Sequence, residues 1–352
     1  MKGSEPPLKY FSELLGNDGL CRRLSADVLN KTLSHAYIIE GAKGSGKHTL
    51  ARSLAAALAC EKSGNGTDEE TLPCGKCLHC RKIFGGKSPD VVTVTREEGK
   101  VQMGVDVIRA VRENVRQLPN ELDIKVYIIE DAHTMNVQAQ NALLLTLEEP
   151  PSFVIFFLLA ETTVPFLETI KSRAPILRLN PLSEDELDAN LARLDPSAAA
   201  LKKERPQEYA EIVKLSSGFL GQAIELIDEK KRTPRLEARR IAKSFISEIP
   251  TRRSGKRSIE IISSFSKQRD ILLRQLSEIE TAVRDLIVIR KCEDAPLCFF
   301  TSKDEATELS YKFNTRALMS LAGAVERAKT RLSSNSNVRL TIYSLAIDCG
   351  LV

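Results

Sequence analysis

The sequence lacks any apolar run long enough to cross a membrane. Its longest candidate, Phe153–Ala160, has the length of a buried strand, whereas a membrane-spanning helix needs about 20 apolar residues. The residues Met1–Pro6 carry a lysine with no apolar segment after it, so we expect no secretory signal. We therefore expect a cytoplasmic protein with no membrane partner.

The chain also lacks a strong excess of one charge. Lysine and arginine number 51, against 47 aspartates and glutamates, which gives a net charge of +4. Residues 251–352 hold 17 basic and 12 acidic side chains, so the C-terminal third is mildly basic. This bias is compatible with a nearby nucleic acid, but an ordinary solvated helical surface is the simpler interpretation.

What the chain does contain is enough apolar material for more than one packed core. Hydrophobic residues make up 42% and charged residues 28% of the 352 positions, a balance typical of globular proteins that excludes a wholly disordered chain. This length predicts two or three domains, and no internal repeat is visible.

The first 180 residues alternate between strand-like and helix-like segments. Strands are predicted in runs of β-branched and apolar residues at 36–40, 90–95, 125–131 and 153–160. Helices are predicted at 49–60, at 104–119 from an apolar residue every three or four positions, and at 136–149 before two prolines. The alternation predicts a parallel sheet covered by helices on both faces.

Beyond residue 181 the strand signal fades and helices are expected. Ser183 and Glu186 have the spacing of a capping box, which predicts the start of a helix. The polar, basic stretch Pro250–Arg257 is expected to form a loop. We predict three domains: an α/β domain at 1–180 with an insert at 60–80, a small helical domain at 181–242, and a larger helical domain at 243–352.

A glycine-rich loop follows the first predicted strand. The residues at 41–49 fit the pattern G-x-x-x-x-G-K, with a predicted helix after it. Glycines let backbone N–H groups turn toward phosphate oxygens, and Lys47 reaches the terminal phosphates. The predicted nucleotide-binding residues of this loop are Gly41, Gly44, Ser45, Gly46, Lys47, His48 and Thr49.

Two positions depart from an active phosphate site. The residue after the lysine is usually a Ser or Thr that helps to hold Mg²⁺, but here it is His48, and Thr49 lies about 100° further round the helix. The strand at 125–131 ends in Glu130 and Asp131, the reverse of the usual Asp-Glu order, although these acids could merely terminate the strand. We expect inefficient hydrolysis, because phosphoryl transfer depends on positioning.

Four of the eight cysteines lie close together, at Cys60, Cys74, Cys77 and Cys80. Cytosolic thiols stay reduced, and four thiolates complete a closed tetrahedral zinc site, so we predict structural zinc. An iron–sulfur cluster and metal-free cysteines are the alternatives. His79 is expected to be a bystander, since four sulfurs suffice.

Together these features resemble the bacterial DNA polymerase III clamp-loader family, which is of the AAA+ type. The resemblance rests on the phosphate loop, the cysteine knuckle, the phrase Asn141–Pro151, and Thr169–Arg173, which is similar to a Ser-Arg-Cys motif with Ala174 in place of the cysteine. It covers residues 10 to about 225. It implies an AAA+ P-loop domain followed by two all-helical domains, the last of them an oligomerisation collar.

Within this family the sequence is similar to the delta-prime branch, which the resemblance implies to be a stator. The gamma/tau branch carries Gly-Lys-Thr, an Asp-Glu pair and an arginine where Gly221 stands here. The resemblance also implies that Arg173 reaches the ATP of a neighbouring subunit. The simpler alternative for Arg173 is an exposed arginine in an intramolecular ion pair.

The resemblance further implies the partners. These are the gamma/tau and delta subunits, the sliding clamp, and primed DNA within the complex, with ATP or ADP held without turnover at the phosphate loop. Two other functions stay open: a gamma/tau-type ATPase motor, and an unrelated P-loop nucleotide kinase with a zinc insert.

Overall fold

The computed structural model describes residues 11, 14–62, 72–98, 100–249, 255–292, 297–334 and 336–351. The chain forms two compact units, one of Met1–Ala189 with Gly218–Gln222, the other of Asn190–Ser217 with Ala223–Val352. The division into three domains stays a prediction. The N-terminal residues used to argue against a secretory signal lie outside the described part of the chain.

The first unit contains a five-stranded, entirely parallel sheet in the order β2-β3-β4-β1-β5. The strands are β1 (Ala36–Glu40), β2 (Val91–Val94), β3 (Lys125–Ile129), β4 (Val154–Ala160) and β5 (Ile176–Arg178). Four of them match the strands expected from the sequence. The fifth, β5, is only three residues long, and was not predicted because so short a run has no periodicity.

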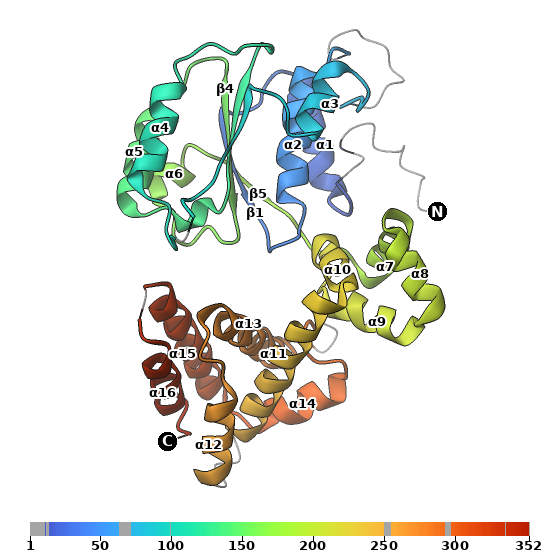
Figure 1. The fold of residues 1–352 in the computed structure, drawn as a ribbon, viewed down its shortest axis with the longest axis vertical. Coiled ribbons are helices and arrows are strands. Elements are labelled where there is room, and N and C mark those ends of the chain that lie inside the picture. The colour runs from blue at the N-terminus through green and yellow to red at the C-terminus, as the bar shows by residue number, and fades with distance from the viewer. Residues whose placement is uncertain are drawn as a thin grey trace. The chain divides into compact units, whose positions relative to one another are not determined.

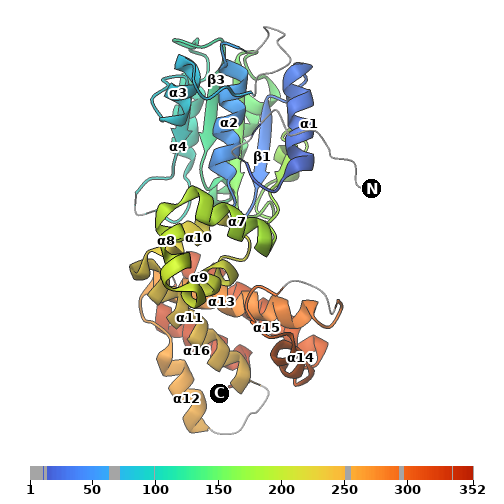
Figure 2. The ribbon, with the colours of Figure 1, turned by 90° about the vertical axis from the view of Figure 1, so that its right-hand side faces the viewer.

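Helices cover both faces of this sheet, as Figure 1 shows. Alternate side chains of a strand point to opposite faces, so Ile39 and Phe157 enter one core with α1 and α2, and Ile38 and Phe156 enter the other with α4 and α5. Figure 2 shows the face covered by α1, α2 and α3. The predicted α/β fold, a parallel sheet with helices on both faces, is confirmed.

Three helices of this unit lie close to their predicted positions: α2 (Lys47–Ala59), α4 (Val105–Asn114) and α5 (Val137–Glu148). The sequence did not predict α1 (Asp18–Leu29), α3 (Leu78–Phe84), α6 (Glu168–Lys171) or the 3-10 helix η1 (Ala132–Thr134). One detail of the prediction was wrong: α4 ends before Leu118, which is 74% exposed instead of buried on the helix face. Pro119, next in the chain, disfavours helical backbone at Leu118.

Two helices, α7 (Glu184–Leu194) and α10 (Leu220–Ile227), contribute residues to both units. The predicted capping box at the start of α7 is confirmed. The Ser183 backbone N–H donates to Glu186 Oε2 at 2.9 Å, and the Glu186 N–H donates to Ser183 Oγ at 3.3 Å.

The second unit is entirely helical in its described residues. Its remaining helices are α8 (Pro196–Glu204), α9 (Pro206–Leu215), α11 (Glu229–Glu248), α12 (Gly255–Ser264), α13 (Arg269–Val288), α14 (Lys303–Tyr311), α15 (Thr315–Ser333) and α16 (Val338–Asp348). The helix α13 packs against α11 and α15 around one apolar core (Figure 1).

Part of the basic loop predicted at 250–257 lies outside the described residues, and its last three residues already belong to α12. Among the described helices, none is both long and apolar enough to span a bilayer.

Candidate nucleotide site and metal centre

The predicted phosphate loop joins β1 to α2. Gly44 and Gly46 have φ angles of 75° and 95°, which residues with side chains rarely adopt. The helix α2 begins at Lys47 with Gly46 as its N-cap, so the unsatisfied N–H groups of its first turn lie at the end of the loop. This arrangement can place several backbone donors around an anion.

The loop is held by bonds to four consecutive carbonyl oxygens. Lys47 Nζ donates to the oxygens of Gly41 and Ala42 at 2.6 and 2.9 Å. Gln222 Nε2 donates to the oxygen of Lys43 at 2.8 Å, and the Gly221 N–H donates to that of Gly44 at 3.0 Å. A trans peptide holds its N–H opposite its C=O, so fixing these carbonyls also fixes the N–H groups that follow them.

Lys47 is the buried cation of this site, with only 9% of its surface exposed. Burial lowers the pKa of its ammonium group, and the nearby carboxylates of Glu161 and Asp131 oppose that shift. The side chain therefore already lies among the loop carbonyls and close to the acids at the ends of β3 and β4.

His48 and Glu130 form a pair beside the loop. The Nδ1 atom of His48 lies 3.5 Å from Oε1 of Glu130, and both side chains are partly exposed. Burial lowers the pKa of His48, whereas the Glu130 carboxylate raises it. The side chain that replaces the usual hydroxyl thus contacts the first carboxylate after β3.

The second carboxylate, Asp131, also faces a basic group. Its Oδ2 lies 3.8 Å from Nη2 of Arg96, and its backbone φ of 46° turns the chain into η1. The sequence alone did not identify Arg96. Nor did it identify His133, which accepts a bond from the Glu161 N–H at 3.4 Å and whose pKa is lowered by burial.

These donors do not fit a magnesium ion held as in an active P-loop site. Mg²⁺ requires near-octahedral oxygen ligands, but an imidazole stands at the hydroxyl position and each carboxylate after β3 faces a basic side chain. A polyphosphate fits better, because the loop, the start of α2 and Lys47 are all present.

The segment Gly218–Gln222 packs directly on the loop. A Cβ added to Gly221 would lie 2.8 Å from Cα of Gly44, and a Cβ on Gly44 would lie 2.6 Å from the backbone nitrogen of Gln222. Both positions therefore require glycine while the two backbones are packed this closely. The sequence placed Gly221 where the gamma/tau branch carries an arginine, but it did not identify the contact made by Gln222.

The four predicted cysteine ligands come together. Their Sγ atoms, in Cys60, Cys74, Cys77 and Cys80, all lie within 4.8 Å of one another and could hold a metal ion. Cys60 follows the last residue of α2, Cys77 is the N-cap of α3, and Gly75 between them has a φ of 67°. Tetrahedral zinc with Zn–S bonds of about 2.3 Å needs sulfurs about 3.8 Å apart, close to the 4.0 Å between Cys74 and Cys80.

Backbone donors point at these sulfurs. The N–H groups of Cys77 and Cys80 donate to the sulfurs of Cys74 and Cys77, each at 3.4 Å. Burial would raise the pKa of Cys74, but backbone donors and neighbouring thiols lower it to about 7. Nδ1 of His79 lies 3.0 Å from the carbonyl oxygen of Ala59, so this ring nitrogen contacts the end of α2.

Arg173 follows α6 and is held at the surface of the first unit. Its Nη2 lies 3.0 Å from Oε1 of Glu148, and its Nη1 donates to the carbonyl oxygen of Thr169 at 3.1 Å. The intramolecular ion pair considered as the alternative is therefore present, while 36% of the side chain stays exposed. The sequence did not identify Glu148 as the partner. Ala174 is fully buried.

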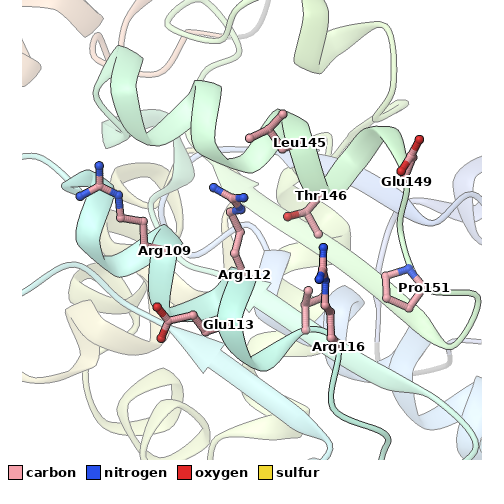
Figure 3. A pocket seen from close by; sticks show the side chains of 9 residues that line it. Arg109, Arg112, Glu113, Arg116, Leu145, Thr146, Glu149 and Pro151 are labelled. Atoms are coloured by element: carbon pink, nitrogen blue, oxygen red, sulfur yellow. The ribbon is translucent and has the colours of Figure 1, made fainter.

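A separate cleft of 780 Å³ lies between α4 and α5 (Figure 3). Arginines at helical spacing were a sequence signal that we did not use. Two carboxylates share the lining, so the cleft is not the uniformly basic surface that a nucleic-acid backbone selects. It is lined by Arg109, Arg112, Glu113, Val115, Arg116, Leu145, Thr146, Glu149 and Pro151.

The amino-acid sequence matches known proteins of bacterial replication. Residues 16–183 match the family described as "DNA polymerase III, delta subunit". The DNA polymerase III subunit tau of Bacillus subtilis is 31% identical over 62% of this chain and 37% of its own length. The subunit gamma of Buchnera aphidicola is 32% identical over 50% of this chain and 47% of its own length. The chain thus spans less than half the length of these relatives.

Among solved structures, a gamma subunit-related protein of Thermotoga maritima is similar with a TM-score of 0.45. It is 18% identical, over 93% of this chain and 98% of that one. The RuvB Holliday junction branch migration motor of the same organism has a TM-score of 0.41, with 16% identity over 81% of this chain and 79% of that one.

Proposed function

We propose that this chain, a member of the DNA polymerase III clamp-loader family, is a delta-prime-type subunit that acts as a stator. In this role it helps to load the sliding clamp onto primed DNA, has little or no ATPase activity of its own, and supplies Arg173 to the ATP site of a neighbouring subunit. The observation that carries the assignment is the pair of His48 and Glu130, which stands where an active site holds its metal.

Two further departures support the stator over the motor. The acids after β3 stand in the order Glu130-Asp131, and Asp131 faces Arg96. Gly221 lies so close to the loop backbone that a side chain at this position would displace the loop. With the two segments packed in this way, position 221 cannot hold an arginine that senses nucleotide.

The gamma/tau-type motor is the second candidate, because the matched relatives are named as tau and gamma subunits. An active motor of this kind needs a hydroxyl after the loop lysine and a carboxylate free to act on metal or water. This chain offers His48 and two carboxylates that face basic side chains. We therefore prefer the stator.

We propose that the cysteine cluster holds structural zinc. Four thiolates leave no open coordination position for water, so the ion would stabilise the fold and take no part in catalysis. The cluster connects the end of α2 to the start of α3, next to the helix that begins at the phosphate loop.

We propose that the C-terminal helices form a collar with the gamma/tau and delta subunits. The helix α16 carries three exposed apolar side chains at helical spacing, Leu340, Tyr343 and Ile347, which are 69%, 57% and 62% exposed. Exposed apolar faces of this kind are typical of protein–protein contacts. The subunit would act in the cytoplasm, where these partners and primed DNA are found.

The trans role of Arg173 is tested in the reconstituted loader. Arg173→Ala should lower its ATPase rate and leave assembly intact, because an arginine supplied in trans is worth on the order of 10³–10⁵ in rate at the site it serves. Lys171→Ala is the matched control, since Lys171 is a neighbouring cation paired with Glu168. An ATPase rate equal to that of the unmodified loader would remove the trans-arginine role.

A further inference from the structure

We infer that the phosphate loop binds a nucleotide polyphosphate without a divalent cation, with the pair of His48 and Glu130 standing in place of the metal. The inference rests on the proposed function, in which nucleotide is held without turnover, and it specifies the ligand: free ADP or ATP in preference to its magnesium complex.

The first step concerns the two positions that ordinarily hold Mg²⁺. In P-loop NTPases these are the hydroxyl after the loop lysine and a carboxylate after the neighbouring strand. In this chain the corresponding side chains are His48 and Glu130, and they contact each other at 3.5 Å. Imidazole suits zinc, copper and nickel, whereas magnesium selects oxygen ligands. A magnesium ion would therefore find few suitable ligands at this site.

The second step concerns charge. Glu130 contacts the imidazole of His48, and Asp131 faces the guanidinium of Arg96 at 3.8 Å, so each carboxylate that would attract a cation already has a nitrogen partner. Lys47 and Arg52 also lie close enough to His48 to lower its pKa. A metal ion that arrived with the nucleotide would meet these basic groups, whereas the phosphates alone would be attracted to them.

The third step concerns the donors that the loop and Lys47 offer to an anion. The carbonyl oxygens of Lys43 and Gly44 accept hydrogen bonds from Gln222 and Gly221, which fixes the direction of the peptides that follow them. To bind the phosphates, Lys47 would exchange its hydrogen bonds to the carbonyls of Gly41 and Ala42 for hydrogen bonds to phosphate oxygens. The loop and lysine thus supply the donors that a polyphosphate requires.

The test is a fluorescence titration of the full chain with mant-ADP, in excess magnesium chloride and in a magnesium-free buffer without chelator, so that zinc at the cysteine cluster is retained. We expect affinity in the magnesium-free buffer to equal or exceed that in magnesium. Lys47→Ala should weaken binding on the order of tenfold or more in both buffers, because a charged hydrogen-bond donor is lost. His48→Thr restores the hydroxyl, so magnesium should then strengthen binding.

Lys171→Ala is the control, since Lys171 pairs with Glu168 outside the loop. Thermal unfolding checks that every variant is folded. Binding that requires magnesium, or no binding in either buffer, would overturn the inference. Neither result bears on Arg173, whose role is measured separately in the assembled loader, so the two proposals can fail independently.

Discussion

At the scale of single residues, Asp90 shows how one buried carboxylate organises the site's sheet. It is fully buried at the start of β2 and accepts the backbone N–H groups of Asn120, Glu121 and Leu122 at 2.6, 2.7 and 2.9 Å. These three residues precede β3, the strand that delivers Glu130 and Asp131. The sequence marked Asp90 only as the first residue of a strand.

We predict that Asp90→Asn destabilises the first unit by about 1–3 kcal/mol, because the amide nitrogen cannot accept and leaves buried N–H groups unpaired. The measurement is the thermal unfolding midpoint of the variant. Asp106→Asn is the matched control, since Asp106 is exposed and pairs with Arg109 at the surface. Equal midpoints for the two variants would show that the Asp90 bonds contribute nothing.

The same carboxylate predicts a pH dependence. Burial alone would raise the pKa of Asp90, but the backbone donors and the Asn120 amide lower it below its usual value. A lowered pKa in the folded state stabilises the protein above the unfolded pKa of about 4, and this stabilisation is lost as the pH falls through the folded pKa. Asp90→Asn should therefore lose less stability than the natural chain on acidification below about pH 4.

At the scale of elements, the cysteine cluster joins the end of α2 to the start of α3. The turn at Gly75 and the N-cap of α3 bring three sulfurs to Cys60 at the end of α2. If zinc holds this junction, its removal should release α3 from α2. Metal binding at sites of this kind contributes roughly 10–16 kcal/mol to local folding.

We predict one zinc ion per chain, and a lower thermal unfolding midpoint after either Cys77→Ser or exposure to a chelator. Cys292→Ser is the control, since this exposed cysteine lies in the other unit. Metal analysis together with the visible absorption spectrum separates the alternatives. An iron–sulfur chromophore, or a purified chain free of zinc, would contradict this assignment.

At the scale of the whole molecule, the proposed stator combines a phosphate loop on a parallel sheet with side chains that we expect to be unsuited to hydrolysis. The loop and Lys47 are in place, but His48 replaces the metal-binding hydroxyl and contacts Glu130. A subunit built in this way would hold its shape while its neighbours turn over ATP. The exposed apolar side chains of α16 fit such a role in an assembly.

We predict that the purified chain hydrolyses Mg-ATP no faster than its Lys47→Ala variant. The reason is that neither the metal nor the attacking water is positioned without the hydroxyl and the free carboxylate. Phosphate release from the chain alone is the measurement. Rapid turnover that disappears in the Lys47→Ala variant would instead assign the chain to the gamma/tau-type motor.

Much of this description was accessible from local sequence patterns. Four strands, the helices α2, α4 and α5, the capping box at Ser183 and the position of the phosphate loop follow from periodicity and from short motifs, because these depend on residues near one another in the chain. The short strand β5 and the exposed Leu118 were missed, since pairing with β1 creates the first and an early helix end exposes the second.

The sequence by itself determined the chemical inventory: a glycine loop with one lysine, a histidine where a hydroxyl is usual, two acids after a strand, and four cysteines. Only the tertiary structure decided what these groups face. It placed Glu130 against His48, Arg96 against Asp131, Glu148 against Arg173, and Gln222 on the loop. These partners lie far apart in the chain, and no local pattern encodes them, because the sheet order and the packing of its helices bring them together.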